Sequence, residues 1–278
     1  MPEILDVHLL RLGEVRIRPD NVAGTWRPML LWTATARRWT DWLPVHAVVV
    51  RHAEGVLLFD TGQSPDSLTD PGYYPGGLVG WAYRRQAEFR IGPGDRLEAA
   101  LASVGLTPDD VDTVVVSHLH QDHAGNLPLL PRARVVLAEA ECALLETKEP
   151  SAHGVLHQHV APPGTRLEPV TFAPLPDDAL APFTTGHDLY GDGTFVLLPT
   201  PGHTPGSSSL LVRRPGAAPL LLVGDLTYDP ALMARDVVPG TGARAAQLAS
   251  TWAVVALQER LPDLRVVAAH DSRAAALV

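Results

Sequence analysis

Short apolar segments alternate along the chain with turns that are rich in glycine and proline. Eight of these segments are rich in Val or Leu and are too short for ordinary helices, so they predict buried strands. They cover residues 45–50, 56–60, 112–117, 134–137, 194–199, 207–212, 219–224 and 265–269. The N-terminal segment, MPEILDVHLLRLGEV, also predicts a strand.

Helical patterns lie between the predicted strands, over residues 96–104, 138–147 and 243–260. Gly105 follows the first pattern and Pro262 follows the third, as expected near helix ends. The strands form two groups, each with helices beside it. We therefore expect an α/β fold in which two sheets pack together with helices outside. The proline-rich stretch 161–183 predicts a loop or a join between the two halves.

Composition narrows the class of protein and its partners. The 278 residues suit a single domain over 1–278, and the formal net charge of −9 with scattered basic residues argues against a nucleic-acid partner. The N-terminus lacks the pattern of a secretory signal, and no run reaches the ~18 apolar residues of a membrane span. We therefore expect a cytoplasmic protein with no membrane partner.

The chain contains one cysteine, Cys142, in a predicted helix. A single cysteine can form neither an internal disulfide nor a cysteine-rich metal site, so we expect a buried structural thiol. Any metal must then be held by histidines and carboxylates.

The strongest chemical signal is the run Ser-His-Leu-His-Gln-Asp-His directly after the apolar strand 112–117. In an extended segment, side chains two residues apart point to the same side, so His118 and His120 can grip one ion together. Asp122 and His123 then come from the following turn and can face a neighbouring position. Imidazole and carboxylate groups suit Zn²⁺, Fe, Co and Mn.

Three later strands each end near another candidate ligand. His203 lies in the motif TPGHTPG, Asp225 ends the segment LLLVGD, and His270 ends VVAAH. Taken singly, Asp225 could be a turn cap and His270 a surface residue. Ligands delivered by separate strand ends are what a composite site at one sheet edge requires.

These motifs together resemble the metallo-β-lactamase superfamily. The pattern HxHxDH, then the PGHTPG histidine, the GD aspartate and a late histidine span nearly the whole chain. The resemblance implies an αβ/βα sandwich of two mixed sheets flanked by helices, with two divalent metal ions per chain. It implies that His118, His120 and His203 hold one metal, that Asp122, His123 and His270 hold the second, and that Asp225 bridges both. It also implies that Asp60, in the turn Asp-Thr-Gly, supports the site by orienting a ligand.

Tyr228, three residues after Asp225, resembles a tyrosine of the N-acyl homoserine lactonases in this superfamily. That resemblance implies a lactonase that hydrolyses the ring ester of a small-molecule lactone with a metal-bridging hydroxide. Tyr228 would donate a hydrogen bond to the substrate carbonyl, and Asp122 would pass a proton to the leaving alkoxide as general acid. The alternative for Tyr228 is an aromatic side chain packed under the site.

The ligand set alone leaves other substrates open. The alternatives are another ester, a phosphotriester or a thioester. A persulfide dioxygenase with one iron would leave part of the ligand set idle, and a nuclease would need a basic surface. Zn²⁺ is the expected metal, with Co, Fe or Mn as alternatives.

Aromatic residues gather in two segments outside the predicted strands, 26–42 and 73–83. Five of the six tryptophans lie there, beside Tyr73, Tyr74 and Tyr83. Such a surface predicts an acyl-chain cleft, a packed lid or a contact in a homodimer.

Overall fold

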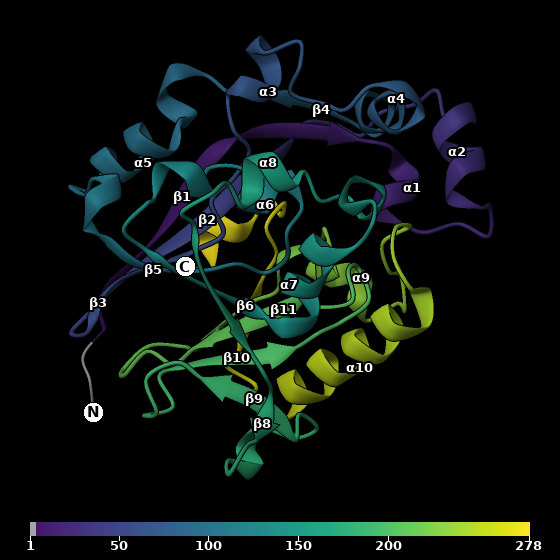
Figure 1. The fold of residues 1–278 in the computed structure, drawn as a ribbon. Coiled ribbons are helices and arrows are strands. Elements are labelled where there is room, and N and C mark those ends of the chain that lie inside the picture. Colours follow the sequence, from purple (N-terminus) through teal and green to yellow (C-terminus); the bar gives the residue numbers. More distant parts are fainter. Residues whose placement is uncertain (1–3) are drawn as a thin grey trace.

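The computed structural model describes residues 4–278, whose strands form two mixed sheets packed face to face (Figure 1). The order in the first sheet is β4-β1-β2-β3-β5-β6-β7, and in the second it is β13-β12-β11-β10-β9-β8. The first sheet comprises β1 (Ile4–Ile17), β2 (Leu43–His52), β3 (Gly55–Phe59), β4 (Ala87–Arg90), β5 (Val111–Val115), β6 (Arg134–Ala138) and β7 (Arg166–Val170). The second comprises β8 (Ala173–Pro174), β9 (Thr185–Asp188), β10 (Phe195–Pro199), β11 (Ser208–Val212), β12 (Leu220–Leu222) and β13 (Arg265–Val267).

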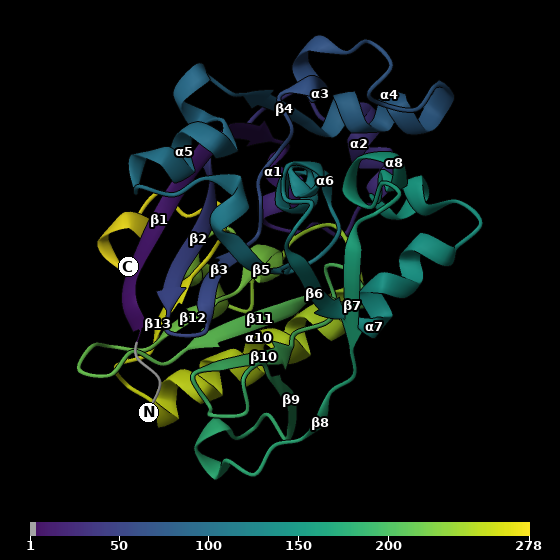
Figure 2. The ribbon, with the colours of Figure 1, turned by 60° about the vertical axis from the view of Figure 1, so that its left-hand side comes forward.

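Helices cover the outer faces of this sandwich. The longest, α10 (Arg244–Arg260), lies along the outer face of the second sheet, and α5 (Leu97–Ser103) packs on the first (Figure 2). The shorter helices are α1 (Pro19–Val22), α2 (Met29–Thr35), α3 (Asp66–Thr69), α4 (Gly77–Gln86), α6 (Gln121–Ala124), α7 (Glu139–Cys142), α8 (His157–Val160) and α9 (Pro230–Met233). The sandwich and its flanking helices confirm the predicted fold class.

Successive side chains along each strand point to opposite faces of the sheet, so one strand contributes to two hydrophobic layers. In β2, Val48 and Val50 face the second sheet, whereas Val49 between them faces the outer layer with α5. In β11, Leu210 faces the first sheet and Leu211 faces α10. Successive strand residues point to opposite faces, so a continuous Val and Leu run fills both layers. Each such side chain, fully buried, stabilises the fold by roughly 1.5–3 kcal/mol.

The eight predicted strands and the N-terminal strand are all present, with ends displaced by a few residues. The stretch 161–183, predicted as a loop or a join, is not simply a loop, because β7 and β8 lie inside it. It is the join between the two halves, since β7 belongs to the first sheet and β8 to the second. β7 is the edge strand of its sheet and is largely half-exposed, so it lacks a strong apolar pattern and tolerates Pro169.

The helix predicted over 138–147 is shorter and less regular than expected. It begins as α7 and continues as a 3-10 turn over Ala143–Glu146. Cys142 is only partly buried, which corrects the expectation of a buried thiol. This partial burial still raises the pKa of the thiol. Within residues 4–278, no helix has both the length and the apolar character needed to cross a membrane.

Candidate metal centre

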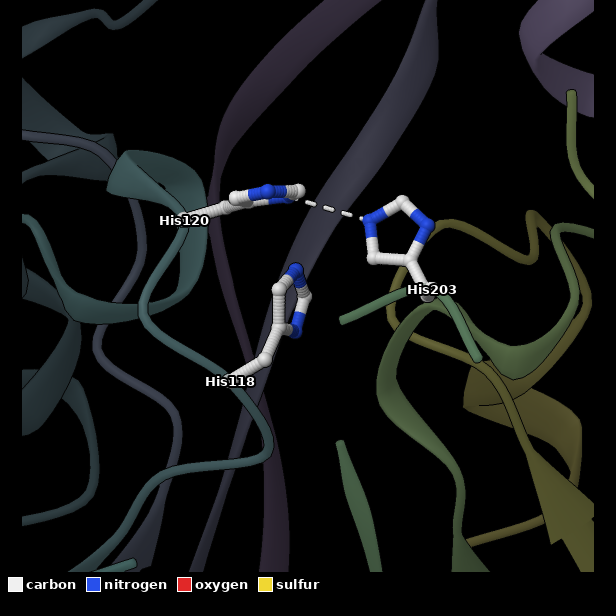
Figure 3. Close-up of side chains that lie close together, drawn as sticks. All are labelled: His118, His120 and His203. Atoms are coloured by element: carbon white, nitrogen blue, oxygen red, sulfur yellow. Dashed lines mark hydrogen bonds between the residues drawn. The ribbon is translucent and has the colours of Figure 1, made fainter. Parts of the chain in front are cut away.

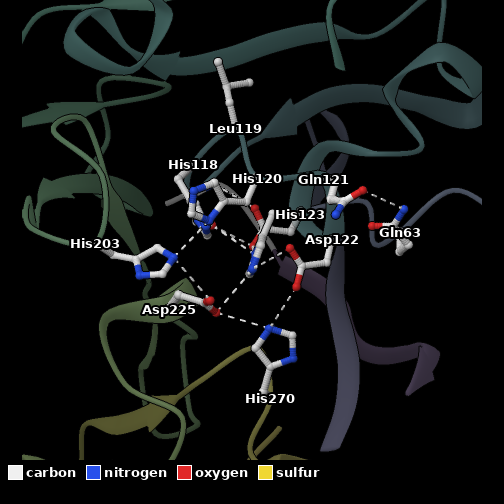
Figure 4. Close-up of polar contacts among 12 residues, drawn as sticks. Gln63, His118, Leu119, His120, Gln121, Asp122, His123, His203, Asp225 and His270 are labelled. Carbon is white, nitrogen blue, oxygen red and sulfur yellow. Dashed lines mark hydrogen bonds and ion pairs between the residues drawn. The ribbon is translucent and has the colours of Figure 1, made fainter. Parts of the chain in front are cut away.

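Seven histidine and aspartate side chains converge where the carboxyl ends of strands from both sheets meet (Figure 4). The first sheet supplies the segment after β5, which includes α6, and the second supplies the segments after β10, β12 and β13. These segments carry His118, His120, Asp122 and His123, then His203, then Asp225, then His270. The structure therefore brings together every ligand that the sequence predicted.

His118, His120 and His203 form one group of potential ligands (Figure 3). Nε2 of His203 lies 3.0 Å from Nδ1 of His120. One nitrogen from each of the three rings lies within 4.8 Å of the others. This spacing lets three imidazoles share a single ion.

Asp122, His123 and His270 form a second group, in which one ligand atom of each residue also lies within 4.8 Å of the others. Nε2 of His270 lies 3.6 Å from Oδ2 of Asp122, and Nε2 of His123 lies 3.9 Å from Oδ1 of Asp122. The Asp122 side chain keeps 18% of its surface exposed, whereas the two rings are buried. Asp122 is thus the member of this group that solvent or a substrate can reach.

Asp225 lies between the two groups. Its Oδ1 is 3.2 Å from Nε2 of both His123 and His270, and its Oδ2 is 3.5 Å from Nε2 of His203. The two oxygens of one carboxylate therefore face different histidine sets, as a bridging ligand requires.

Neighbouring groups fix which ring nitrogen faces the site. Asp60 accepts hydrogen bonds from the Ser117 amide at 2.7 Å and from Nδ1 of His123 at 2.8 Å. Because Nδ1 of His123 donates to Asp60, Nε2 is the nitrogen that offers a lone pair to a metal ion when the ring is neutral. Nδ1 of His270 donates in the same way to the Pro44 carbonyl at 2.9 Å. Asp60 holds this position with φ of +58°, an uncommon conformation for a residue with a side chain.

His120 is oriented from a distant segment. Its Nε2 donates to the carbonyl oxygen of His153 at 3.3 Å, which leaves Nδ1 facing His203. Gly154 follows with φ of +87°, and a Cβ there would lie 2.3 Å from Nε2 of His120. Tyr83 of α4 donates to the Ser151 carbonyl at 3.1 Å and so holds the same segment.

Burial and charge set the protonation of these groups. Burial lowers the pKa of His118 well below its usual value, and it lowers the pKa of His203 to about 3. Burial opposes protonation of His123 as well, but the carboxylates of Asp225 and Asp60 raise its pKa well above the usual value. Burial likewise opposes ionisation of Asp225, yet His123 and His270 hold its pKa well below the usual range.

The donor set fits divalent metal ions. The buried atoms Nε2 of His118, Nε2 of His123, Nε2 of His270 and Oδ1 of Asp225 form no hydrogen bond within residues 4–278. Buried polar atoms without hydrogen bonds are costly. Here they belong to residues grouped closely enough to share an ion, with one ligand atom of each residue in a group within 4.8 Å of the others. Neutral imidazoles and carboxylates are the ligands that Zn²⁺ and similar ions take.

A sequence profile described as "Metallo-beta-lactamase superfamily" matches residues 40–270, which include all seven donors. The chain belongs to the metallo-beta-lactamase superfamily. It has the superfamily's metallo-hydrolase fold, with histidine and aspartate metal-binding groups in the interior.

Relatives within the superfamily align with this protein over most of its length. The N-acyl homoserine lactonase AttM of Azorhizobium caulinodans is 31% identical over 238 residues, 82% of each chain. AttM of Agrobacterium fabrum is 32% identical with the same coverage. A solved N-acyl homoserine lactone hydrolase, with N-hexanoyl-L-homoserine bound at its catalytic metal centre, matches with a TM-score of 0.77. That match is 20% identical and covers 98% of this chain and 95% of the other, so it bears on the fold alone.

Tyr228 lies beside Asp225 and His270. Its hydroxyl donates to Oδ2 of Asp225 at 2.9 Å, and its ring stacks on His270 with centroids 5.3 Å apart. Burial and the Asp225 carboxylate raise the pKa of Tyr228 well above its usual value, so the hydroxyl remains a proton donor. The predicted location of Tyr228 beside the metal-binding groups is therefore observed.

The aromatic segments lie in short helices as well as in loops. α2 and α4 present exposed apolar side chains, including Leu30, Leu78 and Trp81, and Trp26 just before α2 is 91% exposed. Trp32 is buried instead.

A separate cavity of about 570 Å³ lies at the amino ends of β5, β6 and β7, far along the sheet from the seven donors, and is lined mainly by charged residues.

Sequence reasoning missed the residues that position the ligands from other segments. Glu141, His153, Gly154 and Thr241 contact the site or its loops. Their spacing in the chain gives no signal, because each reaches the site only through the tertiary fold.

Proposed function

We propose that this protein is an N-acyl homoserine lactonase that hydrolyses the ring ester of its substrate with the help of two divalent metal ions. The observation that carries the lactone assignment is the agreement among relatives. Those from Azorhizobium caulinodans and Agrobacterium fabrum align over 82% of the chain, and each is an N-acyl homoserine lactonase. Degradation of a quorum signal is the physiological role that follows from this activity.

The histidine and aspartate groups would hold the ions. His118, His120 and His203 would bind one, and Asp122, His123 and His270 would bind the other, with Asp225 shared between them. We propose Zn²⁺ as the native ion, and Co, Fe and Mn accept the same ligands. When bound, such ions lower the pKa of a water molecule toward ~7 and polarise an ester carbonyl.

Tyr228 supplies the group that favours a carbonyl substrate. Its hydroxyl carries one proton, now donated to Asp225. During reaction that bond would be exchanged for one to the lactone carbonyl oxygen, where negative charge develops. Removing a single donor of this kind typically costs 2.7–4 kcal/mol of transition-state stabilisation, or roughly 100- to 1,000-fold in rate.

Asp122 is positioned to return a proton. As water adds to the lactone carbonyl carbon, one of its protons would pass to the Asp122 carboxylate. The ring C–O bond then breaks and leaves an alkoxide, which must take up that proton to give the open-chain N-acyl homoserine. Asp122 is the exposed carboxylate of the second group, at 3.6 Å from Nε2 of His270. We propose that it transfers this proton as general acid.

The exposed apolar residues of α2 and α4 favour a second copy of the chain as partner. Contiguous apolar surface of this kind marks interaction sites. Sedimentation of the wild type and of a Trp26→Ser, Leu30→Ser variant tests this, and a monomer in both would exclude a homodimer through this face.

The function is tested by measuring kcat/KM of metal-counted protein on N-acyl homoserine lactones of increasing chain length. Phenyl acetate, paraoxon and a glutathione thioester serve as competing substrate classes. We expect lactones to exceed the others by at least ~100-fold, which is about 2.7 kcal/mol of preferential transition-state binding. Inert lactones with rapid turnover of another substrate would reject the lactonase assignment while leaving the metal centre intact.

A further inference from the structure

Two loops that carry ligands of the first histidine group are joined by one buried carboxylate. Oε1 of Glu141 accepts a hydrogen bond from the Leu119 amide at 2.8 Å. Oε2 of Glu141 accepts from the Thr204 hydroxyl at 2.5 Å and from the Gly206 amide at 3.1 Å. Glu141 lies in α7 and is fully buried.

These contacts fall beside the histidines themselves. Leu119 separates His118 from His120, and Thr204 follows His203 directly. The first pair comes from the sheet that holds β5, whereas His203 comes from the sheet that holds β10. Glu141 therefore links both halves of a three-histidine group without being one of its ligands.

The backbones are packed closely enough to make this link rigid. A Cβ on Gly206 would lie 2.1 Å from the Glu141 amide nitrogen, so only glycine lets the loop approach α7. The Ser208 amide also donates to the Ser117 carbonyl at 3.0 Å, which ties the two loops at a second point. The Glu141 carboxylate is the side-chain component of this junction.

We propose that Glu141 is a positioning residue that sets the separation of the two loops and so holds His118, His120 and His203 in register for one metal ion. The proposal rests on the metal centre of the proposed function. Groups outside the ligand shell that orient ligands typically change metal affinity by about 10- to 100-fold when they are removed. In the part of the chain described, Glu141 forms no hydrogen bond with the second group, Asp122, His123 and His270, which should be affected less.

Glu141→Gln tests the carboxylate with almost no change in volume. The amide oxygen can replace only one carboxylate oxygen, and the amide NH₂ then faces an N–H donor of one loop or the other. Either orientation releases one loop. Glu139→Gln is the matched control, because Glu139 lies in the same helix and is exposed.

Thr204→Val tests the same link from the opposite side, and Thr204→Ser restores the hydroxyl. If both variants act through one hydrogen-bond network, the combined Glu141→Gln, Thr204→Val protein should lose less affinity than the product of the two single losses. If Glu141→Gln does not fold, the comparison of Thr204→Val with Thr204→Ser decides the proposal alone.

The measurement is Zn²⁺ affinity by competition with a chromophoric chelator, together with the absorption spectrum of the Co²⁺-loaded protein. We expect Glu141→Gln to hold one ion about 10- to 100-fold more weakly, with the second ion nearly unchanged, an altered Co²⁺ spectrum and Thr204→Ser close to wild type. Two ions held as in wild type by folded Glu141→Gln, or both ions weakened equally, would overturn the proposal. A wild-type protein that binds no ion would instead reject the metal centre and the proposed function.

Discussion

Tyr228 and Asp225 share a hydrogen bond of 2.9 Å at the point where both ligand groups meet. Tyr228→Phe removes the hydroxyl while keeping the ring that stacks on His270. We expect kcat on lactones to fall by roughly 100- to 1,000-fold with metal content unchanged, since one transition-state donor is lost. An unchanged rate would show that Tyr228 only packs against the site and does not act in the reaction.

Gly154 combines a left-handed backbone with contact to a ligand ring. In Gly154→Ala the new Cβ would lie 2.3 Å from Nε2 of His120, and φ of +87° would be strained. We expect His120 to be displaced and metal affinity to fall by about 10-fold or more. Metal titration checks this, with Gly164→Ala as control, because Gly164 has φ of +97° and open space around its Cβ position. Equal affinity in the two variants would contradict the role of Gly154.

His46 gives the fold a predictable response to acid. Burial, with a contribution from His270, lowers the pKa of His46 to about 4, whereas an unfolded histidine titrates near ~6.5. Between these values the unfolded chain binds more protons than the folded one. The contribution of His46 to the free energy of unfolding is therefore fully present above pH ~6.5, and it is lost as the pH drops toward ~4.

His46→Leu removes this contribution. From pH ~7 to pH ~5 we expect the wild type to lose about 2 kcal/mol more of its unfolding free energy than the variant. Urea unfolding of both proteins at the two pH values measures the difference. Parallel losses would show that His46 is not held neutral by the fold.

At the scale of elements, Asp60 joins the end of β3 to the segment after β5. It binds the Ser117 amide and Nδ1 of His123 from a φ of +58°. Asn tolerates this backbone conformation, so Asp60→Asn changes the acceptor without adding strain. We expect metal affinity at the His123 group to fall by about 10- to 100-fold. Asp236→Asn is the control, since Asp236 has φ of +55° and makes its side-chain contact elsewhere, with Trp252. If the control weakened metal binding equally, the effect would belong to the backbone and not to His123.

The features that could be predicted from the sequence are those whose residues lie close together in the chain. His118, His120, Asp122 and His123 lie within six residues after an apolar strand, so their joint role is visible in the chain. β7 escaped prediction because an edge strand needs few apolar residues. Glu141 and Gly154 escaped because their partners lie at least 22 positions away, and one glutamate or glycine among many has no distinguishing pattern.

At the scale of the whole molecule, the metal centre joins the two sheets. His118 and His120 follow a strand of the first sheet, whereas His203, Asp225 and His270 follow strands of the second. Ions bound at this junction would stabilise the folded state by mass action, because the unfolded chain holds no preformed site. Chelation should lower the melting temperature by on the order of 10 °C, and added Zn²⁺ should restore it. A melting temperature indifferent to the chelator would argue against ions held between the sheets.

The two-ion assignment depends most on Asp225, whose two oxygens face different histidine groups. Metal counting by elemental analysis of the wild type and of Asp225→Ala tests it directly, with Glu139→Gln as an exposed carboxylate control. We predict two ions per chain in the wild type and in the control. We predict that Asp225→Ala loses both ions. A wild type with one ion, or an Asp225→Ala protein that loses only one, would contradict the shared carboxylate.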